Sequence, residues 1–297
     1  MKYLCYIILF YTSLLIGSNN YDNIYDIRSS PRNIAIGNIH SSTNDIISLF
    51  DSPIHNINNN KFFSLSVNNY NNLIDVYHFA YLLFEKNDVN LSIGLVRREI
   101  DNNFNTQKAD MDNGYPNLFD IDYSKITSFY DKQTGLLFSY NRKMSPNLVL
   151  GINFKPEFHK ILDKSAYGFG MDLRYLFLLN KYNVIIAIDN LFSTKKWETG
   201  LRENYNLNSY ISITTKALKK VSIFSEYDFD KMLRIGLELK IIEMMMLRFG
   251  ADDSNFSFGF GFKLKNFNID YAYIDNKYDI FGNNHCIGLS LNLKEFH

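Results

Sequence analysis

The stretch from Phe256 to Leu264 alternates strictly between two kinds of side chain. Its even positions are Phe256, Phe258, Phe260, Phe262 and Leu264, and its odd positions are Ser257, Gly259, Gly261 and Lys263. Only a β-strand, whose successive side chains point to opposite faces, separates these residues into an apolar and a polar face. The stretches Leu233–Leu239 and Ile287–Leu293 repeat the pattern. These segments are therefore predicted to be strands with one apolar face.

Alternating or wholly apolar runs of strand length recur along most of the chain. The predicted strands are Lys61–Asn68, Ile74–Phe84, Val89–Ile100, Thr134–Arg142, Leu148–Pro156, Ala166–Leu179, Tyr182–Phe192, Leu207–Lys216, Val221–Phe229, Met232–Ile241, Met244–Ala251, Phe256–Leu264, Phe267–Ile274 and His285–Leu293. Many approach the roughly 9–11 residues with which a tilted strand crosses a bilayer, and none of these runs has the roughly 18 uninterrupted apolar residues of a membrane helix. The sequence predicts an all-β fold, an antiparallel transmembrane β-barrel of about fourteen strands.

The connections between the predicted strands support this architecture. Alternate connections are all short: Glu85–Asp88, Lys143–Asn147, Asn180–Lys181, Ala217–Lys220, Ile242–Glu243 and Lys265–Asn266. The long ones all fall between them: Asp101–Gln133, Glu157–Ser165, Ser193–Asn206 and Asp275–Asn284. Outer-membrane barrels have short periplasmic turns and longer outer loops. The alternative fold, a secreted soluble β-sandwich with the apolar face inside a core, does not account for this alternation.

The chain begins with features of an exported protein. Met1-Lys2 precedes an apolar run from Tyr3 to Ile16, and Gly17-Ser18 follows it. This order is typical of a cleaved signal peptide, and about 14 apolar residues are too few for an N-terminal anchor helix. We expect a signal peptide over residues 1–18, an N-terminal hatch or plug segment over 19–60 and a barrel over 61–297, located in the bacterial outer membrane.

Charge and cysteine content exclude several classes of function. The 31 Lys and Arg residues balance 31 Asp and Glu residues, so no net field favours nucleic acid as a partner. Cys5 leaves with the signal peptide and Cys286 then has no partner in its own chain. Catalytic and metal signatures are absent, and Asp110–Gly114, which faintly resembles a calcium loop, is interpreted as a solvated loop. We expect no enzymatic activity, cofactor or metal.

The segment before the barrel has isolated apolar clusters in a polar sequence. Asn44-Asp45 is suited to cap a short helix that contains Ile46, Ile47, Leu49 and Phe50. Three strand segments, Val76–Phe84, Leu176–Leu179 and Val184–Ile188, are apolar on both faces, so their inner faces need a cover. We predict that residues 19–60 fold into the lumen as a hatch over these strands; a periplasmic linker is the alternative.

The same segment resembles a known family. The run Ser29–Ile39, followed by Asn44-Asp45 and then Phe50–Ile54, is similar to the start of the PorV/PorQ-like outer-membrane proteins, relatives of the FadL fatty-acid transporters. The matching hatch-motif residues are Arg32, Gly37, Asp45 and Pro53, whereas Asn38 stands at the second glycine of the family and Asp51–Ile54 replaces its Asn-Pro-Ala-Gly motif. The resemblance implies a barrel of fourteen strands with the N-terminus tucked inside.

Charged residues on the polar faces of the later strands are predicted to face the lumen. They are Arg234, Glu238, Lys240, Arg248 and Lys263. Barrel interiors are usually polar, and a plugged barrel needs its internal charges neutralised. We interpret these residues as pairing with one another, with a polar channel lining as the alternative.

Two kinds of function remain open. The family resemblance implies an outer-membrane protein, surrounded by lipid, that moves a hydrophobic small molecule or assists protein secretion or surface attachment; a monomer is expected. The alternative is a structural or adhesive surface barrel that binds outside partners through the loops Asp101–Gln133 and Ser193–Asn206. An exposed Trp197 would favour adhesion and a buried one would favour a supporting role in its loop.

Overall fold

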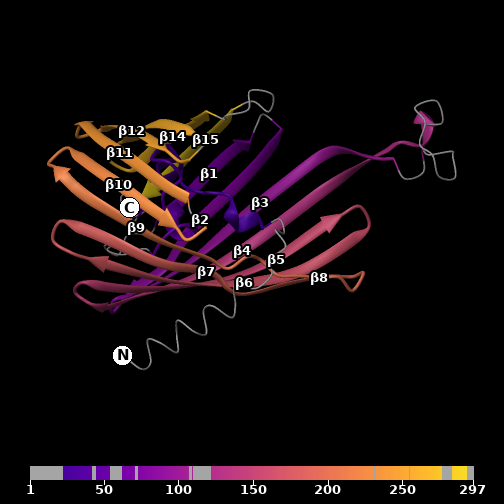
Figure 1. Ribbon diagram of the computed structural model, residues 1–297, viewed down its shortest axis with the longest axis horizontal. Coiled ribbons are helices and arrows are strands. Elements are labelled where there is room, and N and C mark those ends of the chain that lie inside the picture. The colour runs from indigo at the N-terminus through magenta and orange to yellow at the C-terminus, as the bar shows by residue number, and fades with distance from the viewer. Residues whose placement is uncertain are drawn as a thin grey trace.

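The computed structural model describes residues 23–41, 45–53, 62–70, 73–106, 109, 122–230, 232–253, 255–275 and 283–292 (Figure 1). The predicted signal peptide lies outside these residues, as do the stretch Asp110–Gly114 and most of the loop after residue 275. The described residues include four short helices: η1 (Ile24–Asp26), α2 (Pro31–Ala35), η2 (Ile46–Phe50) and η3 (Tyr123–Lys125). None of the described helices is long and apolar enough to cross a membrane.

The strands account for most of the described chain. They are β1 (Phe62–Tyr70), β2 (Ile74–Lys86), β3 (Val89–Asn105), β4 (Thr127–Ser145), β5 (Leu148–Ile161), β6 (Lys164–Leu178), β7 (Tyr182–Trp197), β8 (Arg202–Glu203), β9 (Asn208–Leu218), β10 (Val221–Asp228), β11 (Met232–Ile242), β12 (Met245–Ala251), β13 (Phe256–Lys263), β14 (Phe267–Asp275) and β15 (Asn284–Asn292).

These strands close into an antiparallel barrel of fourteen strands, which confirms the predicted fold. Apart from the short β8, each strand pairs with the next along the chain; β7 pairs with β6 and β9, and β1 pairs with β15 to close the ring. The two-residue strand β8 stands outside the ring and pairs only with the outer end of β7. Closure satisfies the backbone hydrogen-bonding groups around the ring and removes free sheet edges, which is what a bilayer requires.

The predicted strand positions hold, but several strands are longer than predicted. β3 continues to Asn105, β4 begins at Thr127, and β7 continues to Trp197, so parts of the predicted loops Asp101–Gln133 and Ser193–Asn206 are strands. The predicted long loop Glu157–Ser165 is wrong, because β5 continues to Ile161 and β6 begins at Lys164, which leaves a turn of two residues. Figure 1 shows β3 to β7 reaching well beyond the other strands at one end of the barrel. Alternation of apolar and polar residues ceases in these extensions because there charged residues occupy both faces. The sequence pattern therefore marked only the part of each strand with an apolar outer face.

The two faces of the wall have opposite chemistry. On the outward face large apolar side chains are exposed, for example Leu233, Ile235, Phe249, Phe258 and Ile287, each at 46–56% of its full accessibility. Their neighbours in sequence point inward and are buried, among them Arg234, Arg248 and Ser257. A wall that is apolar outside and polar inside suits a barrel surrounded by lipid.

The described N-terminal residues, 23–41 and 45–53, pack inside the barrel, and we call them the hatch. Helix α2 contacts β12 to β15, η2 contacts β1 to β3, and η1 contacts β3 and β4. The apolar residues of η2 form one buried cluster with Val76, Ala80 and Leu82 of β2, which covers the inner face of that strand as predicted. The inner faces of β6 and β7 differ, because Leu176 and Ile185 pack with Val149 and Tyr210 of the wall.

Candidate functional site: the hatch and its ionic contacts with the wall

Each short hatch helix is started by a side-chain cap. Asn23 accepts a hydrogen bond from the backbone N–H of Tyr25, Ser30 from that of Asn33, and Asp45 from that of Ile47. Pro31 occupies the first turn of α2, where a missing N–H costs nothing. Such capped single turns fold only when their apolar residues are buried, and the barrel interior buries them.

At two glycines of the wall, Gly94 and Gly250, the hatch lies so close that a side chain would not fit. Gly37 follows α2 with φ of +93°, a conformation that favours glycine. Opposite it on β12, a Cβ atom added to Gly250 would lie 2.0 Å from the Gly37 nitrogen. On β3, a Cβ atom at Gly94 would lie 2.6 Å from the Phe50 ring. Glycine in the wall therefore permits direct contact between the hatch backbone and the strands.

The first ionic cluster joins α2 to β11, β12 and β14. Arg32 of the hatch makes a bidentate pair with Glu238, at 2.8 Å from Nε to Oε2 and 3.0 Å from Nη2 to Oε1. The same Glu238 Oε2 accepts from Nε of Arg248 at 2.8 Å, and Arg248 Nη1 reaches Asp270 Oδ1 at 2.5 Å. Two guanidinium groups thus face two carboxylates, and the cluster is neutral. We call these four residues the Glu238 cluster.

The second ionic cluster is centred on Glu226 of β10. One carboxylate oxygen accepts from the backbone N–H of His40, and the His40 Nδ1 atom lies 2.8 Å from the same oxygen. Arg234 Nη1 lies 2.5 Å from the other oxygen. The His40 ring stacks on Tyr210 with centroids 3.7 Å apart. Burial, reinforced by the charge of Arg28, lowers the pKa of His40 to about 3, so the imidazole is neutral and its Nδ1–H donates to Glu226.

A third cluster holds the end of η2 against β6 and β7. Arg174 Nη1 donates to the carbonyl of Phe50 at 2.9 Å, and its Nε donates to Asp189 at the same distance. Asp172 accepts from Arg174 at 3.2 Å and pairs with Lys155 at 2.6 Å. Because Arg174 bonds a backbone carbonyl of the hatch, this attachment depends on the position of the hatch chain and not on the identity of its side chains.

Two carboxyl groups of the hatch have a raised pKa because the surrounding protein removes part of their solvation. Asp45 accepts from Ser290 Oγ of β15 at 2.7 Å, while burial and the charge of Asp270 raise its pKa to about 6. Desolvation by the surrounding protein also raises the pKa of Asp26 to about 6, although the residue itself is exposed. Near them, Asp51 accepts from Asn33 Nδ2 at 3.1 Å and lies 3.9 Å from Arg28 Nη1. The hatch thus contains groups that titrate between about pH 3 and 6.

The structure brings most of the predicted site residues to the hatch–wall interface. Arg32, Glu238 and Arg248 form one cluster, and Gly37 and Asp45 touch the wall as described. Pro53 is buried against β5, because a Cβ at Gly151 would lie 3.1 Å from its ring. Arg234, which is also predicted to face the lumen, pairs with Glu226. The other two predicted lumen residues lie at the short-turn end of the barrel. There Lys240 pairs with Glu243 at 2.5 Å, and Lys263 is exposed.

Sequence reasoning missed several interface residues. No sequence motif marks Arg28, His40, Glu226 or Arg174, and the residues with which they pair are distant in sequence. One pattern does mark the wall residues. Asp172 and Arg174 lie at inward-facing positions of β6 between outward-facing apolar residues, and Glu226 lies at an inward-facing position of β10. A charged residue at an inward position of a barrel strand needs a partner across the lumen.

The described interface residues fix the hatch to the wall through ion pairs and hydrogen bonds. No group of three or more His, Cys, Asp and Glu side chains within the described ranges is arranged to hold a metal. Trp197 is half-buried at the end of β7, where its Nε1 donates to Glu203 at 2.8 Å and its ring centroid lies 5.0 Å from that of His159. This placement favours a supporting role in its hairpin. Besides the apolar contacts of η2, the hatch is held by polar contacts that a change of charge can break.

Comparisons with known proteins agree with this architecture. No protein-family model matches the chain, and no curated protein matches it in sequence. Among solved structures it is similar to the toluene transporter TodX of Pseudomonas putida, with a TM-score of 0.65, 10% identity, and coverage of 94% of this chain and 100% of that one. A FadL homologue from Pseudomonas aeruginosa gives a TM-score of 0.53 at 10% identity, covering 93% and 98% of the two chains. The chain therefore has the fold of the FadL-type outer-membrane transporters.

Proposed function

We propose that this protein is a channel of the bacterial outer membrane through which a hydrophobic small molecule passes. The observation that carries the proposal is the hatch, which lies inside a closed barrel with an apolar outer face and is fixed there by ionic contacts. The fold is shared over nearly the whole chain with TodX, a toluene transporter, which supports the same class of function.

The orientation follows from the connections. The short turns, such as Asn87-Asp88 between β2 and β3, belong at the periplasmic end, and the long hairpins of β3 to β8 belong outside the cell. The predicted signal peptide, with which the chain begins, fits export to this location. Molecules would enter between the long hairpins and meet the hatch before reaching the periplasm.

Passage requires the hatch to shift, because its contacts reach around the inner wall. Besides the three ionic clusters, Tyr25 donates through its hydroxyl to the carbonyl of Pro156 at 2.6 Å, and Asn153 Nδ2 donates to the carbonyl of Leu49 at 3.2 Å. Below these contacts, the apolar side chains of Val149, Leu176 and Ile185 form an inner strip that a hydrophobic molecule would follow.

The first experiment tests the barrel and its location. Cells that express the tagged protein are fractionated, and the outer-membrane fraction is run on a detergent gel with and without boiling. A closed barrel in this fraction shifts on boiling. A soluble periplasmic product that does not shift contradicts the proposal.

The second experiment tests transport and the need for hatch movement. Asp45 Oδ1 and Ser290 Oγ are 2.7 Å apart, so cysteines at these two positions, in a Cys286→Ser background, would tie the hatch to β15. We expect uptake of a radiolabelled monoaromatic hydrocarbon by expressing cells, its loss on oxidation of the cysteine pair, and its recovery on reduction. The Cys286→Ser protein without the pair is the matched control. Equal uptake with and without the protein would refute the transport function.

A second candidate function has one observation in its favour. The long hairpins of β3 to β7 extend beyond the rest of the barrel (Figure 1), which suits an accessory role in secretion or surface attachment, as the resemblance to the PorV/PorQ-like proteins implies. Removal of the β3–β4 extension, residues 103–128, tests this role. Loss of a surface-attached protein without loss of hydrocarbon uptake would support it.

A further inference from the structure

We infer that the outer surface of the barrel contains a site for the phosphate-bearing headgroup of an outer-leaflet lipid, in the notch between the β3–β4 extension and the β5–β6 turn. This inference rests on the outer-membrane location proposed above and does not depend on transport. The notch arises because the pairing of β4 with β5 ends at Asp131 and Ile161, while β4 continues outward along β3 to Thr127. A gap is left beside the free edge of β4.

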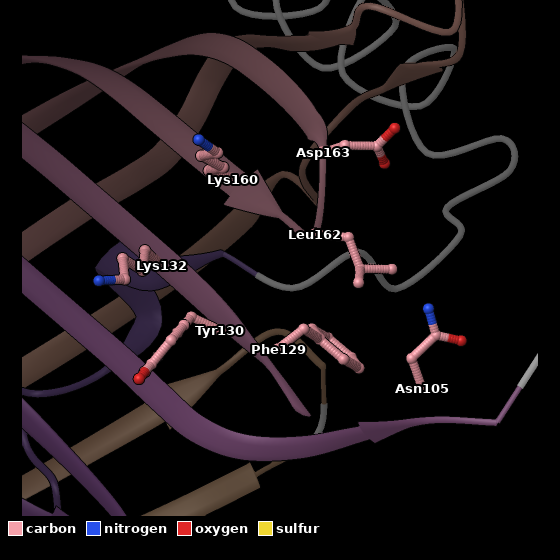
Figure 2. Close-up of a pocket in the computed structure, with 7 residues that line it drawn as sticks. All are labelled: Asn105, Phe129, Tyr130, Lys132, Lys160, Leu162 and Asp163. Carbon is pink, nitrogen blue, oxygen red and sulfur yellow. The ribbon is translucent and has the colours of Figure 1, made fainter. Parts of the chain in front are cut away.

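The notch is a cavity of about 730 Å³ with both apolar and cationic walls. Figure 2 shows Leu162 at the β5–β6 turn, Phe129, Tyr130 and Lys132 along β4, and Lys160 on β5. Such a lining suits an amphiphile, because the ammonium groups match an anionic head and the Tyr130 ring and the Leu162 side chain match its apolar part. Asp163 at the rim is the one acidic lining residue, and it pairs with Lys164 at 3.1 Å.

The two lysines are arranged in a way that an anion would stabilise. Lys132 and Lys160 are directly opposite each other across β4 and β5. Both point outward, because their neighbours Gln133 and His159 are buried on the inner face. Like charges at opposite positions of neighbouring strands repel each other and destabilise the pair. A phosphate between the two ammonium groups would remove this repulsion.

The carboxylates nearby neutralise only part of the positive charge. Glu99 lies 2.6 Å from Lys132 Nζ but also 3.0 Å from Arg97 Nη2, so one carboxylate serves two cations. Within the described part of the chain, Lys160 makes no hydrogen bond or ion pair with its side chain. Arg97, Lys132, Lys160 and Lys164 therefore face Glu99 and Asp163, which leaves an excess of two positive charges on an exposed outer face.

The position of the lysines along the barrel identifies the lipid headgroup as the source of the anion. On the same face, toward the middle of the barrel, β4 continues with Leu136 and Phe138, and β5 with Phe158 and Phe154, all exposed. At roughly 3.3 Å per residue, the lysines lie one or two side-chain lengths above this apolar belt. Lipid headgroups occupy this level, and their acyl chains would run down beside Phe158. A basic group near such a surface contributes to lipid affinity.

The test uses the purified full-length barrel in nanodiscs and in detergent. Retention of phosphatidylglycerol against phosphatidylcholine is measured by native mass spectrometry for the unaltered protein and for K132Q/K160Q. We expect preferential retention of phosphatidylglycerol and a loss of affinity of about thirtyfold in this variant, from two surface charges. The conservative variant K132R/K160R should retain the preference. K125Q/K219Q, which removes two exposed charges elsewhere, is the matched control and should also retain it.

Three results would overturn the inference. Equal retention by K132Q/K160Q and the unaltered protein would remove the lysines from the site. Equal loss in K125Q/K219Q would reduce the effect to overall charge. Complete displacement of the lipid by millimolar inorganic phosphate would assign the notch to free phosphate. Hydrocarbon uptake is measured separately on the same variants, and heat-modifiability shows whether each barrel is closed. Failure of the proposed transport can therefore be told apart from failure of lipid binding.

Discussion

Replacement of Glu238 by glutamine is expected to release the α2 side of the hatch without opening the barrel. Glu238→Gln keeps the size of the side chain and removes the charge that faces both Arg32 and Arg248. Two guanidinium groups would then face Asp270 alone, and the Arg248 side chain is only 2% exposed. Removing one partner of a buried ion pair costs about 3–5 kcal/mol. Because Arg32 and Glu238 keep 18% and 14% exposure, we take the lower limit, about 3 kcal/mol, on this scale.

A loss of about 3 kcal/mol corresponds to a rise of roughly 150-fold in the population with a released hatch. Trypsin reports this population, because Arg28 and Arg32 become cleavable when the hatch leaves the wall. We expect faster hatch cleavage in Glu238→Gln and an unchanged shift on boiling, since backbone pairing closes the ring. Glu243→Gln is the control, because its carboxylate is 89% exposed and pairs with Lys240 at the turn. Equal cleavage rates in Glu238→Gln and the unaltered protein would refute the reasoning.

Three further perturbations of the hatch have defined outcomes. The folded-state pKa of His40, about 3, lies below its ordinary value, so its contribution to hatch docking is complete above about pH 6.5 and lost as the pH falls toward 3. The unaltered protein should therefore resist trypsin better than His40→Gln at neutral pH, and this difference in cleavage rate should shrink as the pH falls across this window. A difference that stays constant with pH would contradict the prediction. The pKa of Asp45, about 6, is raised, so its contribution is complete below about pH 3.9 and lost as the pH rises through 6. Asp45→Asn, which keeps the cap, should dock more tightly by about 1–2 kcal/mol at pH 8 and equally at pH 4; no gain at pH 8 would contradict the raised pKa. Gly250→Val places atoms where the Gly37 backbone lies and should expel the hatch, whereas Ala251→Val on the outward side of β12 should not; proteolysis compares the two.

The barrel could be predicted from the sequence because lipid imposes one requirement on every strand. An outward apolar residue at every second position, as in Phe256–Leu264, is visible in a single strand and needs no knowledge of its partners. The alternation stops where the strands leave the bilayer, and for this reason the extensions at 127–133 and 193–197 were predicted as loops. The strand β8 has only two residues and shows no period at all.

The contacts of the hatch could be predicted only in part. The apolar residues of η2 required burial, and the doubly apolar strand β2 offered the matching surface. Ionic partners follow no such rule, because the pairing of Arg32 with Glu238 depends on the strand number, the register and the path of the hatch together. His40 illustrates the limit, since one isolated histidine in a polar segment gives no sign that it will stack on Tyr210 and bond Glu226.

These two kinds of contact divide the hatch into parts with different properties. Around η2 the hatch is held by apolar burial against β2 and β3, which is non-directional and independent of pH. Around Arg32 and His40 it is held by charges on β10 to β12, whose strength depends on geometry and protonation. A change that weakens the charges acts on one side of the hatch and leaves the apolar anchor seated. The same trypsin-sensitive segment should therefore be exposed by Glu238→Gln and by acid acting on His40, because both loosen the attachment to the same strands.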